Sequence, residues 1–208
     1  MCGICGFVGN GSKSILINMR EKMVHRGPDD AGIYFNLENQ IGLGHRRLSI
    51  IDLSERGRQP MESFSGESVI TYNGEVYNYL DIKKELELKG IYFRSNTDTE
   101  VILEAIQYWG IKAINKFHGM FAIAMWNKSK KELLLVRDRL GIKPLYYSIT
   151  NSGKIIFASE IKALLEHPDV PKVINYKALD CYLKIDYVPG NRTIFKYVHK
   201  LLPAHYLT

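Results

Sequence analysis

The chain opens with MCGICGFVG, residues 1–9, in which a cysteine stands directly behind the start methionine. The apolar run 4–8 ends at a Gly-Asn-Gly turn, which predicts a buried strand at the very start of the chain. Cys2 then has three open interpretations. It is half of a redox or metal pair with Cys5, a small buried hydrophobic residue, or a nucleophile that is exposed when Met1 is removed.

The redox or metal pair is the weakest of the three interpretations. Cys2 and Cys5 form a single Cys-x-x-Cys, whereas structural zinc normally has four ligands, and the six histidines show no ligand spacing. A thioredoxin-like site also lies between a strand and a helix, not at a chain terminus. We therefore expect no metal, and we interpret Cys5 as a small buried residue that faces the core.

The position of Cys2 favours the nucleophile over the buried residue. Methionine aminopeptidases remove Met1 when a small residue such as cysteine follows, which leaves Cys2 with a free α-amine whose reference pKa is about 8. Thiol and amine on one residue then form a nucleophile with its own base, so that no separate histidine is needed. A core cysteine has no reason to prefer the terminus, and chemistry explains the position better than packing does.

The composition argues against several classes of protein. The net charge is only +6 and the basic residues are scattered among acidic ones, so we expect no nucleic-acid partner. Three cysteines make no disulfide framework, which indicates a reducing compartment. No apolar run approaches the roughly 18 residues of a membrane span, and the start lacks the basic and apolar regions of a signal peptide. We expect a cytoplasmic protein without a membrane partner.

Hydrophobic periodicity predicts helices and strands along the whole chain. Helices are expected at residues 14–25, 78–88, 98–109, 160–166 and 176–184, with Asn78 capping the second. Strands are expected at residues 4–8, 32–35, 40–44 and 68–72, then in two hairpins, 120–126 with 132–137 and 145–149 with 155–158, and in a short final strand.

Two stretches do not follow a clean period. Residues 45–61 are expected to form a long ordered loop, and the strand from Ser68 is expected to break at Asn73-Gly74. Strands in runs and helices in pairs indicate an α+β fold rather than a parallel βαβ sheet. Neither GxGxxG nor GxxxxGK[ST] occurs, so the chain carries no nucleotide-binding fingerprint.

A set of segments in fixed order carries a family resemblance. They are MCGICGF, HRGPDDAGIY, HRRLSIIDLS, QPM, YNGEVYNY, SNTDTEVIL, GMFAIAMW, RDRLGIKPLYY and ASEIKAL. Together they resemble the glutaminase domain of class II glutamine amidotransferases, of the asparagine synthetase (glutamine-hydrolysing) type, over nearly the whole chain. Relatives that aminate sugars or phosphoribosyl groups share the terminal cysteine but lack the RLSIIDLS loop.

The resemblance implies a fold and an activity. Residues 2–208 are expected to form one glutaminase domain with the N-terminal nucleophile hydrolase fold, a four-layer αββα sandwich of two antiparallel sheets with helices outside. The thiol of Cys2 is expected to attack the side-chain amide of L-glutamine, release ammonia and form a γ-glutamyl thioester, which water then hydrolyses to glutamate. No cofactor is expected for this reaction.

The same resemblance assigns the site residues. Asn73 and Gly74 are expected to form the oxyanion hole, through a side-chain amide and a backbone N–H. Arg47 is expected to bind the α-carboxylate of glutamine with its guanidinium fork, and Glu75 and Asp98 are expected to hold the α-ammonium. The pocket wall is expected to come largely from the backbone of Leu48, Ser49, Ile50 and Ile51.

Each of these residues has a structural alternative when it is taken alone. Arg47 is then a surface arginine, Asp98 is an N-cap within Asn96-Thr97-Asp98, and Asn73-Gly74 is a type I′ turn. Their joint appearance in family order favours the functional interpretation.

Two charged clusters are expected to be structural. Arg26, Asp29 and Asp30 within HRGPDD are expected to shape a turn and brace the pocket rather than touch substrate. The run Arg137-Asp138-Arg139 is expected to make buried or interdomain ion pairs.

The second half of that family, an ATP-using synthetase domain with an SGG[VI]DS-type phosphate loop, does not occur within these 208 residues. We expect a piece of a longer enzyme or a naturally short protein, whose ammonia serves a synthetase domain in cis or in trans that makes asparagine from aspartate. ATP and Mg are expected only in that absent domain. The ammonia acceptor and the oligomeric state stay open, with a homodimer as one option.

Rival functions also stay open. The domain is an amidotransferase for another acceptor, or a non-catalytic interaction or regulatory module if Met1 stays attached. It is otherwise an N-terminal nucleophile amidohydrolase with another substrate, such as an acylase, which has little need for Arg47 opposite Asp98.

Overall fold

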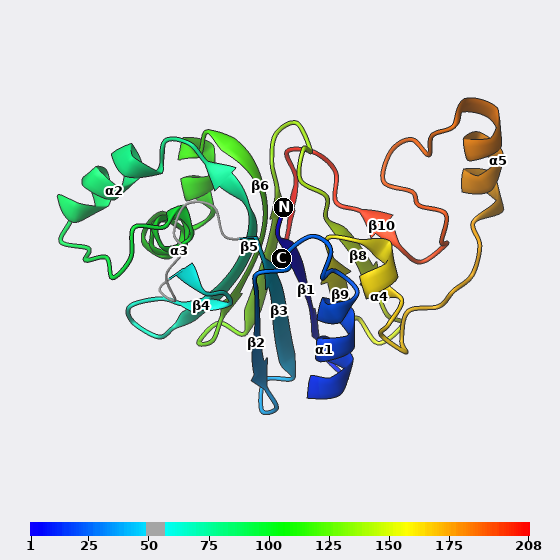
Figure 1. Ribbon diagram of the computed structural model, residues 1–208, viewed down its shortest axis with the longest axis horizontal. Coiled ribbons are helices and arrows are strands. Elements are labelled where there is room, and N and C mark those ends of the chain that lie inside the picture. The colour runs from blue at the N-terminus through cyan, green and yellow to red at the C-terminus, as the bar shows by residue number, and fades with distance from the viewer. Residues whose placement is uncertain (49–56) are drawn as a thin grey trace.

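Helices and sheets are stacked in layers in the computed structural model, which describes residues 1–48 and 57–208. Two antiparallel sheets lie face to face at the centre, and helices cover their outer faces (Figure 1). The helices on one side are α1 (Lys13–Glu21) and α4 (Ile161–Leu164). Those on the other side are α2 (Tyr79–Glu87) and α3 (Asp98–Trp109), which runs on into the 3-10 helix η2 (Gly110–Lys116).

The strands of the described residues form two sheets. The first has the order β10-β8-β9-β1-β3-β2, and its strands are β1 (Gly3–Val8), β2 (Asp30–Asn36), β3 (Ile41–Arg47), β8 (Tyr146–Ile149), β9 (Ile155–Ala158) and β10 (His199–Lys200). The second has the order β11-β7-β6-β5-β4, and its strands are β4 (Met61–Glu62), β5 (Ser68–Val76), β6 (Gly119–Asn127), β7 (Glu132–Arg137) and β11 (Tyr206–Leu207).

Alternating side chains on the strands build three apolar cores, one between each pair of layers. Between the first sheet and its helices lie Cys5, Phe7, Met19 and Leu164. Between the two sheets lie Ile4, Leu43, Val69, Ala122 and Phe157. Between the second sheet and its helices lie Tyr72, Ile82, Ile102 and Phe121. Three cores separate four layers, so the αββα arrangement follows from the period-2 pattern of the strands.

Strand β1 pairs on both sides, with β3 and with β9, so the N-terminal strand is central rather than at an edge. Its register sets Gly3 opposite Arg46 and Ile4 opposite His45. Cys2 therefore lies beside the end of β3. The expectation that Cys5 faces the core is confirmed, since its side chain is fully buried against α1.

Several expected elements are confirmed with small changes. The helix at 98–109 and both hairpins form as predicted. Helix α1 begins after Ser12, whose hydroxyl accepts from the N–H of Ile15, but it ends at Glu21 and not at residue 25. Helix α5 (Tyr176–Ile185) also forms, and it stands away from the sheets on a projecting arm (Figure 1).

Two predictions about loops are wrong. Strand β3 continues to Arg47, so residues 45–47 belong to a strand and not to a loop, while residues 49–56 lie outside the described part of the chain. Strand β5 does not break at Asn73-Gly74, and the alternative of a type I′ turn is wrong as well. Both residues pair with β6, Asn73 with Ala122 and Gly74 with Phe121. Continuous cross-strand pairing over nine residues outweighs the local turn preference.

Two structural roles also differ from expectation. Asn78 makes no capping hydrogen bond at α2, and its side chain instead joins the C=O of Lys116 and the N–H of His118. The run at 137–139 binds backbone groups: the Asp138 carboxylate accepts from four backbone N–H groups, and its neighbours donate to carbonyls. None of the three appears among the salt bridges of the described residues, so the expectation of buried ion pairs within the domain is wrong, while interdomain pairs stay a prediction.

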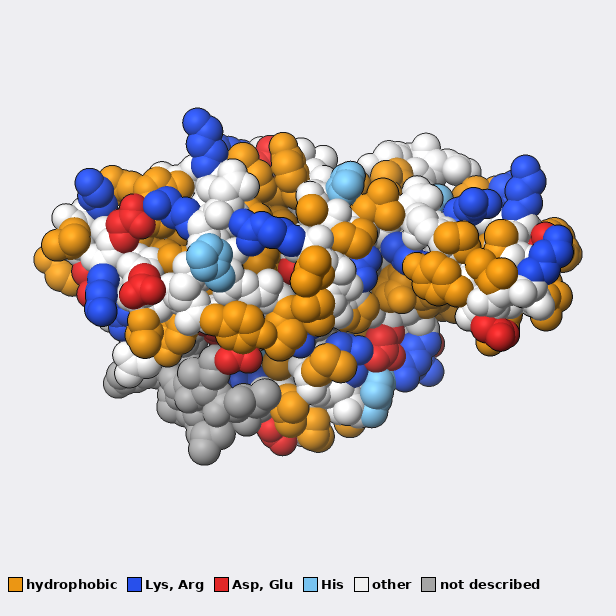
Figure 2. Space-filling view, turned by 90° about the horizontal axis from the view of Figure 1, so that it is seen from above, with side chains coloured by type: hydrophobic (Ala, Val, Ile, Leu, Met, Phe, Trp, Pro, Cys, Tyr) orange, Lys and Arg blue, Asp and Glu red, His pale blue; other side chains and the backbone are white. Residues whose placement is uncertain are grey.

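The molecular surface mixes both signs of charge on the face seen in Figure 2, without a single basic stripe. Hydrophobic side chains are exposed on the arm that carries α5, among them Tyr176 and Leu183. No helix within residues 1–48 or 57–208 is long and apolar enough to cross a bilayer.

Candidate active site

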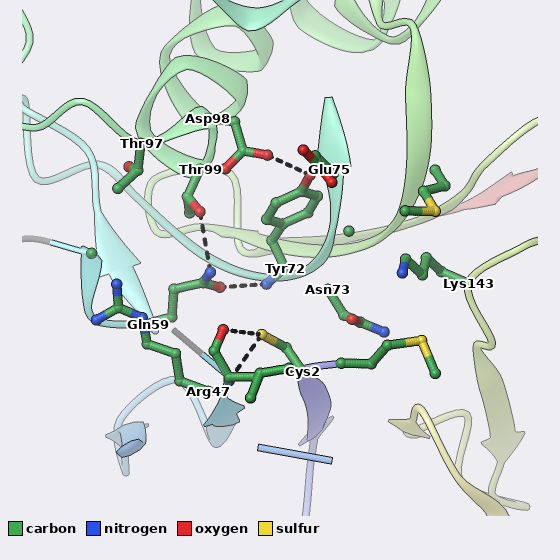
Figure 3. A pocket seen from close by; sticks show the side chains of 15 residues that line it. Cys2, Arg47, Gln59, Tyr72, Asn73, Glu75, Thr97, Asp98, Thr99 and Lys143 are labelled. Carbon is green, nitrogen blue, oxygen red and sulfur yellow. Dashed lines mark hydrogen bonds between the residues drawn. The ribbon is translucent and has the colours of Figure 1, made fainter. Parts of the chain in front are cut away.

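A cavity of about 220 Å³ lies where the N-terminus meets the second sheet. Cys2 enters it from the start of β1, Arg47 and Leu48 from the end of β3, and Asn73 to Glu75 from β5. The start of α3 closes it with Asp98 (Figure 3). At roughly 30 Å³ per water molecule, the volume is that of about seven waters, which suits a ligand the size of an amino acid.

The thiol of Cys2 is held by the backbone of Leu48. The N–H of Leu48 donates to Sγ at 3.4 Å, and Sγ lies 3.7 Å from the Leu48 carbonyl oxygen. Met1 is attached to Cys2, is 60% exposed and also lines the cavity.

Asn73 presents a buried amide group beside Cys2. The side chain is only 2% exposed, yet Nδ2 has no hydrogen-bond partner among the described residues. An unsatisfied buried donor costs about 1–3 kcal/mol, so proteins rarely keep one without a reason. The side chains of Asn73 and Cys2 border the same cavity (Figure 3). The arrangement leaves a donor ready for an acceptor on a bound molecule.

The backbone N–H of Gly74 points to the same free edge of β5. In an antiparallel pair, alternate residues turn their N–H and C=O groups toward the same neighbour. The N–H of Tyr72 donates to Gln59 Oε1 at 2.6 Å, and that of Val76 donates to Asp98 Oδ2 at 3.2 Å, both away from β6. Gly74 stands between them and shares their orientation. Consecutive residues thus bring a side-chain donor and a backbone donor to one cavity.

Two glycines pack against the end of β3, one at its backbone and one at the guanidinium of Arg47. A Cβ on Gly27 would lie 2.4 Å from the backbone of Arg46, so only glycine lets the HRGPD turn pack against the end of β3. A Cβ on Gly57 would lie 2.2 Å from Arg47 Nη2, so the guanidinium rests over that residue. Arg47 is 8% exposed, and the alternative of a surface arginine is wrong.

Asp98 faces the cavity from the first turn of α3. Its Oδ2 accepts from the hydroxyl of Tyr72 at 2.7 Å and from the N–H of Val76. Burial raises the pKa of Asp98 above its ordinary value, against the hydrogen bonds from Tyr72 and Val76, and the charge of Glu75 raises it further. The helix cap is Thr97, which accepts from the N–H of Glu100, so the N-cap alternative for Asp98 is wrong.

His45 joins the two sheets beneath the cavity. Burial lowers the pKa of its imidazole to about 4, so the ring is neutral at pH 7. Nε2 lies 3.1 Å from the carbonyl oxygen of Tyr72, and because a carbonyl only accepts, Nε2 carries the proton. The bond ties β3, which carries Arg47, to the strand that carries Asn73.

Two residues that line the cavity are not predicted as site residues from the sequence. Gln59 donates through Nε2 to Thr99 at 3.1 Å and accepts from Tyr72, and so joins α3 to β5. Lys143 is buried and reaches the cavity beside Met120. Both lie within the quoted segments QPM and RDRLGIKPLYY, but neither spacing nor periodicity points to a cavity.

Comparison with known proteins identifies the family of this chain. A family model described as a glutamine amidotransferase domain matches residues 1–208. The chain belongs to the glutamine amidotransferase domain family. A putative glutamine-hydrolysing asparagine synthetase 2 of Methanocaldococcus jannaschii is 38% identical and covers 97% of this chain. Asparagine synthetase 1 of Bacillus subtilis, also named as glutamine-hydrolysing, is 41% identical and covers 99%.

Solved structures support the fold of this amidotransferase domain. Glutamine phosphoribosylpyrophosphate amidotransferase from Bacillus subtilis aligns over 78% of this chain and 42% of its own, with a TM-score of 0.65 and 21% identity. The expected α+β class, the N-terminal nucleophile hydrolase fold with two antiparallel sheets, is confirmed. The chain spans only 42% and 33% of the two asparagine synthetases.

The amidotransferase domain brings the predicted site residues together wherever they are described. The cavity is lined by Cys2, Arg47, Leu48, Asn73, Gly74, Glu75 and Asp98. Ser49, Ile50 and Ile51 lie outside the described residues. Within residues 1–48 and 57–208, no group of three or more His, Cys, Asp or Glu side chains is arranged to hold a metal. The roles of the individual residues stay predictions.

The three thiols of the domain are expected to differ in reactivity. Burial raises the pKa of Cys5 to about 12 and removes it from solvent, whereas Cys2 and Cys181 are partly exposed. Only a thiolate reacts quickly with iodoacetamide. Brief labelling of the native protein at pH 8, followed by peptide mass spectrometry, is expected to modify Cys2 and Cys181 but not Cys5. Labelling in urea is the control, and native modification of Cys5 at the rate of Cys2 would contradict the prediction.

Proposed function

We propose that this domain hydrolyses L-glutamine to glutamate and ammonia, with Cys2 as the nucleophile. The observation that carries the proposal is the buried Asn73 amide, a donor without a partner among the described residues, beside the Cys2 thiol in a cavity of amino-acid size. A hydrogen-bond donor beside the nucleophile stabilises the negative charge that develops on a bound carbonyl oxygen during attack.

The proposed reaction begins after removal of Met1. The α-amine of Cys2 takes the thiol proton, and Sγ bonds to the side-chain amide carbon of glutamine. The carbonyl oxygen gains negative charge and accepts from Asn73 Nδ2 and the Gly74 N–H, which contribute about 3–4 kcal/mol each in such sites. The ammonium on the terminus returns the proton to the leaving nitrogen, ammonia departs, and water cleaves the thioester to free glutamate and Cys2.

The other end of the cavity suits the charged groups of an α-amino acid. The guanidinium of Arg47 has the fork that pairs with a carboxylate through two parallel hydrogen bonds. Asp98 and Glu75 are close enough to raise the pKa of Asp98 by their mutual repulsion. An α-ammonium between the two carboxylates relieves that repulsion and favours the ionised form of Asp98.

The ammonia is proposed to serve a second active site. Because the two relatives are named asparagine synthetases and are much longer, we propose that residues 2–208 are the glutaminase domain of such an enzyme. ATP, Mg and aspartate would then bind in a synthetase domain, in cis or in trans. A reducing cytoplasm is the proposed setting, since the catalytic thiol must stay unoxidised.

Loss of the Cys2 thiol is expected to abolish the reaction. In Cys2→Ala, glutamate release falls below about one tenth of normal, because nothing replaces the nucleophile. Release is measured with protein whose intact mass proves that Met1 is absent, and Cys181→Ala is the matched control with normal turnover. Protein made with a methionine aminopeptidase inhibitor keeps Met1 and is expected to be inactive. Full turnover by the Met1-bearing form would show that the amine is not the base.

Truncation of Asn73 is expected to slow the chemical step selectively. Asn73→Ala lowers kcat by about a hundredfold or more, because one oxyanion donor is lost, while KM for glutamine changes little. Asn127→Ala, at the far end of β6, is the matched control with unchanged kinetics. An unchanged kcat in Asn73→Ala would remove the residue from that role.

Truncation of Arg47 is expected to weaken substrate binding instead. Arg47→Ala raises KM for glutamine by about tenfold or more, since hydrogen bonds to a charged group contribute about 1.5–3 kcal/mol. Arg46→Ala is the matched control, because Arg46 is on the opposite face of β3 and pairs with Glu21. Turnover that is intact in Arg47→Ala would favour an amidohydrolase with a substrate other than an α-amino acid.

A further inference from the structure

The start of β1 is held from outside the cavity by the residues that follow β9. The N–H of Ile4 donates to the hydroxyl of Ser159 at 3.0 Å, and the N–H of Ser159 donates back to the carbonyl of Ile4 at 2.8 Å. This pair of bonds fixes the strand two residues beyond Cys2. It leaves Cys2 itself without a strand partner, because β1 begins at Gly3.

Arg26 supplies the missing contact to Cys2. Its Nε donates to the carbonyl oxygen of Cys2 at 2.9 Å, and its Nη1 donates to Oε1 of Glu160 at 3.0 Å. The Arg26 side chain is only 10% exposed. One guanidinium therefore bridges the backbone of the proposed nucleophile and the carboxylate that directly follows Ser159.

Glu160 also contacts the side-chain nitrogens of His25 and Lys162. His25 Nε2 lies 2.9 Å from Oε1, and Lys162 Nζ lies 3.2 Å from Oε2. Burial alone would raise the pKa of Glu160, but the hydrogen bonds from Arg26, His25 and Lys162 outweigh it, so the pKa is lowered. His25 and Lys162 are about half exposed and contribute little energy. Their effect is to keep an ionised carboxylate directed at Arg26.

We propose that Glu160 is a positioning residue that fixes the nucleophile through the chain Glu160–Arg26–Cys2. Once Met1 is removed, Cys2 is the chain terminus, and termini fray unless they are tied down. The Cys2 carbonyl oxygen is then a backbone group that a neighbouring side chain, here Arg26, can hold by a hydrogen bond. A displacement of about 1 Å of a reacting group can slow a reaction a hundredfold, so this anchor has a large effect on rate. The inference rests on the proposed glutamine hydrolysis.

The chain is tested with Arg26→Gln, Glu160→Gln and the double variant. Arg26→Gln is expected to lower kcat by about tenfold or more, with KM for glutamine within about threefold. Glu160→Gln lowers kcat less, because the guanidinium keeps its bond to Cys2. The double variant is no slower than Arg26→Gln alone, since Glu160 acts only through Arg26. Glu21→Gln is the matched control, because Glu21, at the end of α1, also pairs with two arginines. This variant is expected to have normal kcat and KM.

A second measurement does not depend on activity. Hydrogen–deuterium exchange of the peptide that spans β1 is expected to quicken in Arg26→Gln and Glu160→Gln but not in Glu21→Gln, with melting temperatures matched within a few degrees. A kcat within about twofold of normal in Arg26→Gln, additive losses in the double variant, or unchanged exchange would each overturn the proposal. If no variant and no parent protein releases glutamate while exchange still quickens, the proposed function fails and the anchor stands.

Discussion

The pairing of β1 between β3 and β9 is the constraint on which the site depends. A chain terminus normally frays, because it lacks a covalent neighbour on one side and packing on the other. Here the first strand is central, and Ile4 and Phe7 are buried on its two faces. Residue 2 is thereby held at the mouth of the cavity with a precision that a terminal residue does not otherwise have. The proposed catalytic group, the thiol of Cys2 with its own terminal amine, needs such a strand.

Strand β5 supplies the complementary half of the site through its two periodicities. The side chains of its odd-numbered residues face the first sheet, which brings the Asn73 amide to the cavity. The backbone N–H groups of its even-numbered residues point away from β6, which brings the Gly74 N–H to the same cavity. A local Asn-Gly turn would have spread these donors apart. The energy of β5 and β6 pairing therefore preserves a costly arrangement at the place where a bound carbonyl would use it, namely the buried Asn73 amide, which has no partner among the described residues.

The sequence predicts those parts of the fold that depend on local pattern. Helix α3 and the β6–β7 hairpin follow from periodicity and turn residues close to them in the chain. The sequence-based prediction is wrong where a residue's conformation depends on a partner far away in the sequence. The Asn78 side chain donates to the carbonyl of Lys116 instead of capping α2. Asn73 and Gly74 stay in β5 because β6 pairs with them. Family resemblance names the polar site residues, but Gln59 is missed, because its partners Tyr72 and Thr99 become neighbours only in the fold.

The cavity has two unfavourable polar features that one zwitterionic ligand would relieve together. At one end Asn73 keeps a donor that has no acceptor within residues 1–48 and 57–208, and at the other Asp98 has a raised pKa with Glu75 near it. A carbonyl oxygen satisfies the first, and an ammonium satisfies the second by compensating the buried negative charge. Only a molecule that carries both groups at the right separation relieves both at once. The proposed glutamine hydrolysis would then favour glutamine over its shorter homologue, because a ligand one methylene shorter gives up one contact to keep the other.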